Sequence, residues 1–417
     1  MSVLYKETNS KIFKKRIQTR NVIAILSPLL TLSVVSGVST LWWNVNFTKL
    51  TSRTSLKIFI TLLTLISLAY LVVLPIGLGV VTRKPNLNAT NSSNSEEDTP
   101  NTHLTIKLTI PFSVSLVGFL NKLKMLVTVQ SNFIPIVEEL LIAETKLQYP
   151  TKKFIEERKS VFYLLIGMFL YSFPMQLILL FINITPISFI LFLSTVYTNF
   201  GIFTVELQFC TLSVLIVRRL RFLHERITSI KTSKYASTIY TVQNLKDVHR
   251  DLNEVCKMVI DYYNVPILMS LTYTTLGSFM NVYFAIFGGF KDAGVKEVVT
   301  KRPTLEIVGH YFYAVYYFGR FCLVCVAADR MMSEVGSTKL YLADVLNRNL
   351  LGDLRKEVKH FFNYASCKKL RFTICGLFKL EVAVITTLVR VKKKLKNRKN
   401  ILGGTNQLKP CGSSLGV

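Results

Sequence analysis

Few residues in this sequence are spaced for catalysis. The sequence contains no G-x-S-x-G, Walker A, H-E-x-x-H or G-x-G-x-x-G motif, which would mark nucleophile, phosphate, zinc or dinucleotide sites. Cys322 and Cys325 form a C-x-x-C pair inside an apolar run, where two small polarizable residues on a helix face are the better interpretation. The five histidines are dispersed without metal-ligand spacing: His103, His224, His249, His310 and His360. We therefore expect no enzyme, no metal site and no cofactor.

Two ionisable residues lie deep inside apolar stretches, Glu206 in 187–217 and Arg320 in 309–330. A charge within a membrane costs about 2.5–3.5 kcal/mol on insertion scales, so it usually faces protein or water. One interpretation is a pore, gating or ligand contact. The other is a Glu–Arg pair that stabilises a helix bundle, or an arginine whose head group extends to the membrane surface. The sequence favours neither interpretation.

Aromatic and amide side chains are dense near the outer ends of the later apolar stretches. Apolar walls with a few hydroxyls or amides suit a small-molecule pocket. The aromatic belt that any membrane protein carries at the lipid–water interface is the simpler explanation for each single residue, although Tyr283, Tyr316 and Tyr317 lie deeper than a belt usually reaches. The candidate pocket residues are Tyr171, Gln176, Tyr197, Asn199, Tyr283, Tyr316 and Tyr317.

The composition indicates a membrane protein. Half of the 417 residues are hydrophobic and only 18% are charged, against about 25% in soluble domains. The net charge of +27 fits either nucleic-acid binding or the basic cytoplasmic loops of a membrane protein, and the high hydropathy favours the loops. A disordered chain, a collagen, a coiled coil and a disulfide-stapled secreted domain are excluded.

Several stretches are long and apolar enough for transmembrane helices, which need about 20 residues. An eighth stretch, 373–389, is shorter and ends at a basic run. No internal repeat of the kind found in transporters is visible. The seven stronger stretches are 22–43, 58–81, 105–128, 161–182, 187–217, 268–289 and 309–330.

The basic residues predict which segments face the cytoplasm, where Lys and Arg collect. Of the 51 Lys and Arg residues, 28 lie in 1–21, 129–160, 218–266 and 331–372. These segments share one side only if 22–43 does not cross the membrane fully. Its Pro28, Gly37 and six Ser or Thr residues support that reading, and an ordinary first span with one miscounted loop is the alternative. The N-terminus is then cytoplasmic.

This topology predicts the organisation of the chain. Residues 1–57 form a cytoplasmic N-terminus with the short apolar helix 22–43, and 58–330 form a six-span bundle with cytoplasmic helical segments 129–160 and 218–266. Residues 331–372 form a cytoplasmic anchor helix, 373–389 a partial seventh span, and 390–417 a basic tail. Within 218–266, apolar residues at three-to-four spacing predict an amphipathic helix: Val242, Leu245, Val248, Leu252, Val255, Met258 and Val259.

Glycosylation sequons agree with this topology. Asn88 and Asn91 lie in the polar stretch 82–104, and Asn183 follows the fourth candidate span, 161–182. All three fall outside the cell in the predicted topology, whereas the sequon at Asn46 falls inside and should be unused. Sequons occur often by chance, so this agreement is supportive only.

Over about residues 20–389 the sequence resembles the insect gustatory receptor family of seven-span chemoreceptors. The stretch HRDLNEVCKMVIDYYNVPIL looks like the family's last cytoplasmic helix before its fifth span, and SPLLTLSVVSGVSTLWW is similar to its short N-terminal helix. The resemblance is specific around 368–381 and diffuse over the rest of 20–389. The residues similar to the family's C-terminal signature are Phe372, Thr373, Gly376, Leu377, Phe378, Leu380 and Glu381.

The resemblance implies an all-α polytopic bundle with six clear spans and an incomplete seventh. It implies a ligand-gated cation channel subunit that binds a small tastant in an outward pocket and assembles as a homo- or hetero-tetramer. It places the chain in the plasma membrane of chemosensory neurons, in contact with lipid and not with nucleic acid. A polytopic solute transporter is the alternative function.

The sequence departs from the family after Glu381. The Thr-Tyr and Gln-Phe pairs of the family's seventh span are missing, and eight Lys or Arg residues lie in 390–417. We predict that this tail is not native to the family, for example through reading past a final splice donor near 389–392. A truncated isoform that does not conduct is therefore a further alternative.

Overall fold

The computed structural model describes the C-terminal two thirds of the chain best. The described residues are 132–150, 153, 155–163, 166–167, 186–230, 235–287, 304–348, 350, 352–367, 372–374 and 378–379, with short pieces of 26–58 and 116–124. The predicted spans 58–81, 105–128 and 161–182 and the tail 390–417 lie wholly or mostly outside these residues.

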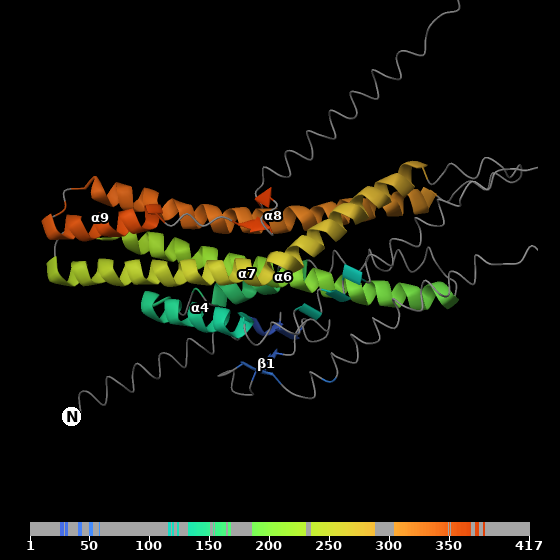
Figure 1. The fold of residues 1–417 in the computed structure, drawn as a ribbon, viewed down its shortest axis with the longest axis horizontal. Helices are drawn as coiled ribbons and strands as arrows, with labels where there is room; N and C mark the ends of the chain where they lie inside the picture. Colours follow the sequence, from blue (N-terminus) through green and yellow to red (C-terminus); the bar gives the residue numbers. More distant parts are fainter. Residues whose placement is uncertain are drawn as a thin grey trace, which may run out of the picture.

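Three long helices dominate the described part of the chain (Figure 1). They are α6 (Pro186–Thr228, 43 residues), α7 (Tyr235–Phe287, 53 residues) and α8 (Thr304–Leu346, 43 residues). At 1.5 Å per residue these helices are about 65–80 Å long, roughly twice the 30 Å hydrocarbon core of a bilayer. Each helix that crosses a membrane must therefore continue well beyond it.

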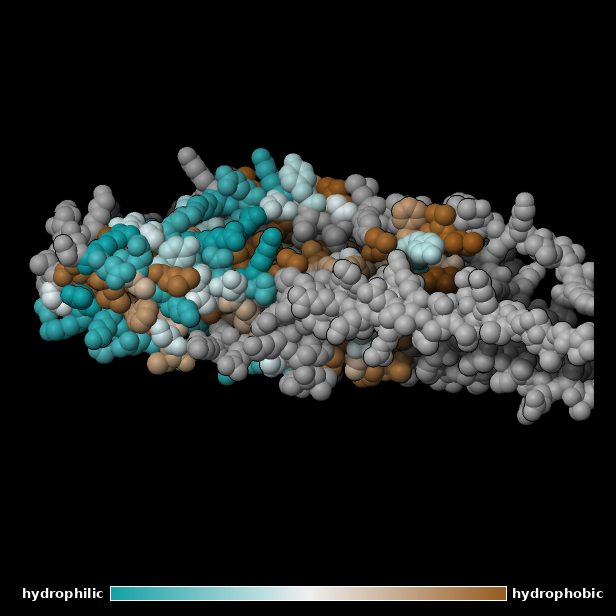
Figure 2. Space-filling view, turned by 90° about the horizontal axis from the view of Figure 1, so that it is seen from above, coloured by the Kyte–Doolittle hydropathy of each residue, from teal (hydrophilic) through white to brown (hydrophobic). Residues whose placement is uncertain are grey.

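The hydropathy of the residues differs along the bundle. Asn199–Thr228 and Ile307–Leu346 are long and apolar enough to cross a membrane, a test that buried core helices of soluble proteins also pass. Figure 2 shows hydrophilic residues gathered at the end of the bundle that holds α9 (Gly352–Cys367), and apolar residues further along it. The predicted spans 187–217 and 309–330 lie within α6 and α8, and 268–289 overlaps the end of α7.

The polar end of the bundle has a well-packed core. The face of α7 predicted from apolar spacing is confirmed, because Val242, Leu245, Val248, Leu252 and Val255 are all buried. This face packs against α4 (Ile134–Leu147), α6 and α9. Polar contacts add to this packing. The Lys246 ammonium of α7 lies 2.9 Å from the Glu357 carboxylate of α9, and the His224 Nε2 of α6 lies 2.8 Å from the Thr338 hydroxyl of α8.

The predicted single anchor helix 331–372 is wrong in one respect. Residues 331–346 continue α8, and a turn separates them from α9. In this turn the Asn347 and Arg348 N–H groups bond to the carbonyls of Ala343 and Val345, both at 3.1 Å. Gly352 then starts α9, which folds back on α8 and α7.

Two short hairpins replace predicted helix. Leu41–Trp43 (β1), at the end of the expected helix 22–43, pairs antiparallel with Leu50–Ser52 (β2). Thr373–Ile374 (β3), at the start of the expected partial span, pairs with Phe378–Lys379 (β4). Aromatic and β-branched residues favour extended backbone, and the three residues between β3 and β4 include a glycine, which suits a short hairpin loop. A helix therefore does not begin at Thr373.

Candidate ligand-binding site

A buried ion pair joins α6 to α8. The Arg320 Nε donates to Glu206 Oε2 at 2.7 Å, and both side chains are almost fully buried. The Ser270 hydroxyl of α7 donates to the other oxygen of Glu206, so three helices meet at this carboxylate. The pair that the sequence analysis raised as one of its alternatives is thus present.

Helical spacing places a second acceptor on the same arginine. Asn199 lies seven residues, or two turns, before Glu206, so both side chains project from one face of α6. The Arg320 Nη1 donates to Asn199 Oδ1 at 2.6 Å. The network compensates both buried charges, which would otherwise cost several kcal/mol each.

A cluster of tyrosines packs beside the guanidinium. Tyr313, Tyr316 and Tyr317 of α8 are buried together with Tyr273 of α7. The hydroxyls of Tyr273 and Tyr317 lie 2.7 Å apart and share a hydrogen bond. Ile202 of α6 completes this cluster, which is separate from the main hydrophobic core of the described residues. We call these five residues the tyrosine cluster.

The rings of this cluster face the arginine. The Arg320 guanidinium carbon lies 5.4 Å from the ring centre of Tyr316 and 5.9 Å from that of Tyr317, with Phe203 at 5.4 Å on α6. A cation at these distances is stabilised by the negative face of each ring. The arginine therefore links the polar network to the aromatic one.

A glycine lets α7 approach the cluster closely. A Cβ added at Gly277 would lie 3.0 Å from a ring atom of Tyr317. The hydroxyl of the next residue, Ser278, donates to the Ala314 carbonyl at 3.2 Å. One turn after Gly277, Asn281 Oδ1 lies 2.9 Å from His310 Nδ1. Polar contacts between α7 and α8 thus continue past the tyrosine cluster toward the ends of both helices.

The structure brings together five of the residues predicted from sequence: Asn199, Glu206, Tyr316, Tyr317 and Arg320. Tyr283 does not join them, because it is 39% exposed on α7.

The remaining predicted pocket and glycosylation residues are not placed in this site. Tyr197 is a residue of α6, and the structure does not describe its side chain. Tyr171, Gln176, Asn88, Asn91 and Asn183 lie outside the described residues.

The structure describes three of the signature residues, Phe372, Thr373 and Phe378. The Phe372 ring is buried 5.6 Å from that of Phe209 on α6, which anchors the chain just before β3. Thr373 lies in β3 and Phe378 in β4. Gly376, Leu377 and Glu381 fall outside the described residues.

Sequence reasoning missed Ser270, Tyr273 and Tyr313. Ser270 and Tyr273 are one helical turn apart on α7, and Gly277 follows at the next turn, so all three share a face. That small–aromatic–small spacing was the available signal, but it lies in the half of the span away from the dense outer aromatic residues. Among the described residues no group of three His, Cys, Asp or Glu could hold a metal ion.

Comparisons with known proteins agree on one family and one fold. A family model described as 7tm Chemosensory receptor matches residues 26–390. The olfactory receptor OR5 from Machilis hrabei has a similar structure, with a TM-score of 0.65 over 89% of this chain and 96% of that chain at 13% identity. The same receptor in complex with eugenol gives 0.64 over 90% and 96%, again at 13% identity. A search of curated protein sequences gives no match.

Proposed function

Because the chain belongs to the 7tm chemosensory receptor family, we propose that it is a gustatory receptor, a ligand-gated cation channel subunit that detects a small tastant. The observation that carries this proposal is the buried Glu206–Arg320–Asn199 network beside the tyrosine cluster. It places hydrogen-bonding groups and aromatic walls where three helices of a multi-span receptor meet, as a small-molecule site requires.

An uncharged ligand suits these surroundings. Glu206 already neutralises Arg320, so an ionised ligand would bring an uncompensated charge into a buried site at a cost of several kcal/mol. The tyrosine rings offer flat apolar walls, and their hydroxyls offer a few donors and acceptors. The related olfactory receptor has been solved with eugenol, a small uncharged molecule.

Taste rather than smell is proposed from the C-terminal signature. The run from Phe372 to Glu381 is similar to that of gustatory receptors, and Phe372 is the buried anchor of this run against α6. We further propose a homo- or hetero-tetramer in the plasma membrane of chemosensory neurons. The basic tail after 389 raises the alternative of a subunit that binds ligand without conducting.

Two readouts separate these functions. The full chain is expressed in cultured cells, and its surface arrival is measured with an extracellular tag. A panel of sugars, bitter compounds and volatile phenols is then applied while currents are recorded. Ligand binding is measured in parallel by the thermal shift of the detergent-purified protein. A receptor channel gives both responses to the same ligands, and a non-conducting isoform gives the thermal shift alone.

Tyr317→Phe tests whether the site is correctly located. This change keeps the ring and removes a hydroxyl of the tyrosine cluster, so the half-maximal ligand concentration should rise several-fold. Tyr311→Phe is the matched control, because Tyr311 is on the same helix and 48% exposed. Equal responses of both variants, or uptake of a solute without current, would contradict the proposal.

A further inference from the structure

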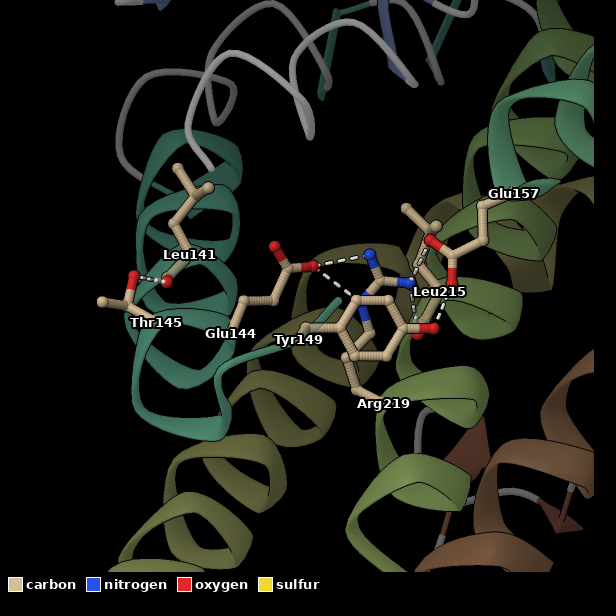
Figure 3. Close-up of polar contacts among 7 residues, drawn as sticks. All are labelled: Leu141, Glu144, Thr145, Tyr149, Glu157, Leu215 and Arg219. Carbon is tan, nitrogen blue, oxygen red and sulfur yellow. Dashed lines mark hydrogen bonds and ion pairs between the residues drawn. The ribbon is translucent and has the colours of Figure 1, made fainter. Parts of the chain in front are cut away.

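A second buried charge cluster lies toward the polar end of the bundle (Figure 3). Arg219 of α6 lies between Glu144, in the last turn of α4, and Glu157, in the helical segment 155–163. Exposed fractions are 0% for the side chains of Arg219 and Glu144 and 2% for that of Glu157. One guanidinium therefore joins α6 to two segments that lie 62 and 75 residues earlier in the chain.

The end of α4 is built to present this cluster. Gln148 adopts a left-handed conformation (φ 51°) that ends the helix. The next residue, Tyr149, folds back so that its N–H bonds to the Glu144 carbonyl at 3.3 Å. The Tyr149 ring then lies 4.7 Å from the Arg219 guanidinium carbon, and its hydroxyl donates to Glu157 Oε1 at 2.6 Å.

The two carboxylates are not equivalent. Both oxygens of Glu157 accept hydrogen bonds, one from Tyr149 and the other from Arg219 Nη1 at 2.7 Å. Glu144 uses a single oxygen, Oε1, which lies 2.6 Å from both Nε and Nη2 of Arg219. Its Oε2 is buried without a hydrogen-bond partner among the described residues, and Figure 3 shows it turned away from the arginine.

The charges in the cluster do not balance. Two carboxylates face one guanidinium, which leaves one buried negative charge when both are ionised. The nearest ionised groups are already paired elsewhere. On the α7 side of α4, Lys146 lies 2.5 Å from Asp251.

On the α6 side, the cations beside Arg219 are also engaged. Arg218 bonds the Ser160 hydroxyl at 2.9 Å, and Lys153 lies 2.9 Å from Glu225. None of these groups donates to Glu144 Oε2 among the described contacts. Among the residues that the structure describes, no further cation is available, and a proton is the remaining means of neutralising the buried charge.

We propose that Glu144 is a proton-binding site that holds α4 against α6 when protonated. A protonated Glu144 removes the excess charge, while its Oε1 still accepts from Arg219. Glu157 is the better satisfied of the two acids, because both of its oxygens accept hydrogen bonds. The segments that carry these residues are on the side that the charge pattern predicts to be cytoplasmic, so the site would sense intracellular protons.

The electrostatics agree with this geometry. Burial raises the pKa of Glu144 to about 7, against the lowering effect of Arg219 and with a small further rise from Glu157. A folded-state pKa above the unfolded value of 4.5 means that the folded protein binds more protons between pH 4.5 and 7. Stability from this group is therefore full below about pH 4.5, falls as pH rises to 7, and is constant above that.

The test compares the wild type with Glu144→Gln, which mimics the protonated acid at every pH. Thermal midpoints of the full chain in detergent are measured from pH 5 to 8.5. The variant should match the wild type near pH 5 and exceed it by a margin that grows by about 1–2 °C per pH unit up to pH 7. Glu138→Gln, at an exposed position on the same helix, should track the wild type throughout.

An infrared measurement keeps the proposal testable even if Glu144→Gln does not fold. The wild type should show the C=O stretch of a protonated carboxyl at pH 6 that disappears with a midpoint near pH 7. The band should be missing in Glu144→Gln and retained in Glu138→Gln. Absence of the band in the wild type, or its loss in Glu157→Gln but not in Glu144→Gln, would overturn the assignment.

Discussion

The Glu206 carboxylate and the Arg320 guanidinium meet at 2.7 Å across 114 residues of sequence, and neither charge reaches solvent. Such a pair contributes little net stability when it replaces apolar packing, but breaking it leaves an uncompensated charge. The pair is therefore a constraint on how α6 and α8 can move apart, and it borders the region proposed to receive ligand.

Breaking this pair should destabilise the protein strongly. Glu206→Gln leaves Arg320 without its counter-charge and should cost about 3–5 kcal/mol, read as a lower thermal midpoint and reduced surface expression. The exchange Glu206→Arg with Arg320→Glu should recover part of the loss relative to either single change. Glu254→Gln, at an exposed site on α7, is the control. A double variant no better than the singles would show that pairing is not what matters.

Gly277→Ala should be harmful although alanine is the better helix former. The new Cβ would lie 3.0 Å from the Tyr317 ring, and the displaced ring should cost about 1–3 kcal/mol. Gly336→Ala on α8 meets no atom within 4 Å and should instead stabilise by about 0.5–1 kcal/mol. Thermal melts of the two variants should thus shift in opposite directions, and shifts of the same sign would contradict the close approach.

The hydroxyls of Tyr273 and Tyr317 should show strong coupling. Either Tyr→Phe change alone leaves a buried hydroxyl with no partner across the helix pair, at a cost of about 1–3 kcal/mol, whereas the double change removes both hydroxyls and should cost less than the two singles added together. A double-mutant cycle on thermal midpoints measures this term. Additive effects would mean that the two groups do not depend on each other.

His249 should make the protein sensitive to acid. Burial lowers the pKa of His249 to about 4, and its Nε2 has no partner among the described residues. The folded protein therefore binds fewer protons than the unfolded chain between pH 4 and 6.5. The free energy of unfolding decreases as the pH is lowered from 6.5 to 4, by up to about 3 kcal/mol. In His249→Gln the thermal midpoint should depend less on pH over this range than in the wild type.

His360→Gln, at an exposed position of α9, is the control for the histidine prediction. Its midpoint should follow the wild type across the whole pH range. The Glu144 contribution to stability decreases as the pH rises from 4.5 to 7, opposite to the effect of His249 in an overlapping pH range. Each variant is therefore compared with the wild type at the same pH. Equal acid sensitivity of the wild type and His249→Gln would exclude this source.

The sequence predicted what depends on composition and periodicity. The buried face of α7 from Val242 to Val255 follows from apolar residues at three-to-four spacing, and the cost of isolated charge made Glu206 and Arg320 stand out. It did not predict Ser270 or Tyr273, because their roles depend on which face of α7 meets α6 and α8. The β3–β4 hairpin was missed because its apolar residues also suit a membrane helix.

The same reasoning failed at the Arg219 cluster. Glu144, Glu157 and Arg219 occur in segments rich in surface charge, where nothing in the sequence separates a buried acid from an exposed one. Only the pairing of α4 with the bundle identifies which carboxylate lacks a donor. Contacts between segments distant in sequence therefore decide which of these acids is buried without a donor, and the local sequence does not reveal it.

α8 is one uninterrupted helix that carries both Arg320 and Thr338, so a rigid tilt of the helix about the ion pair would move both of its ends. From Arg320 to Leu346 the helix extends about 39 Å, so a tilt of about 5° about Arg320 would displace Leu346 by about 3 Å. A tilt of α8 that begins beside Tyr317 would therefore displace the part of the helix that packs against α9 without any further connecting element.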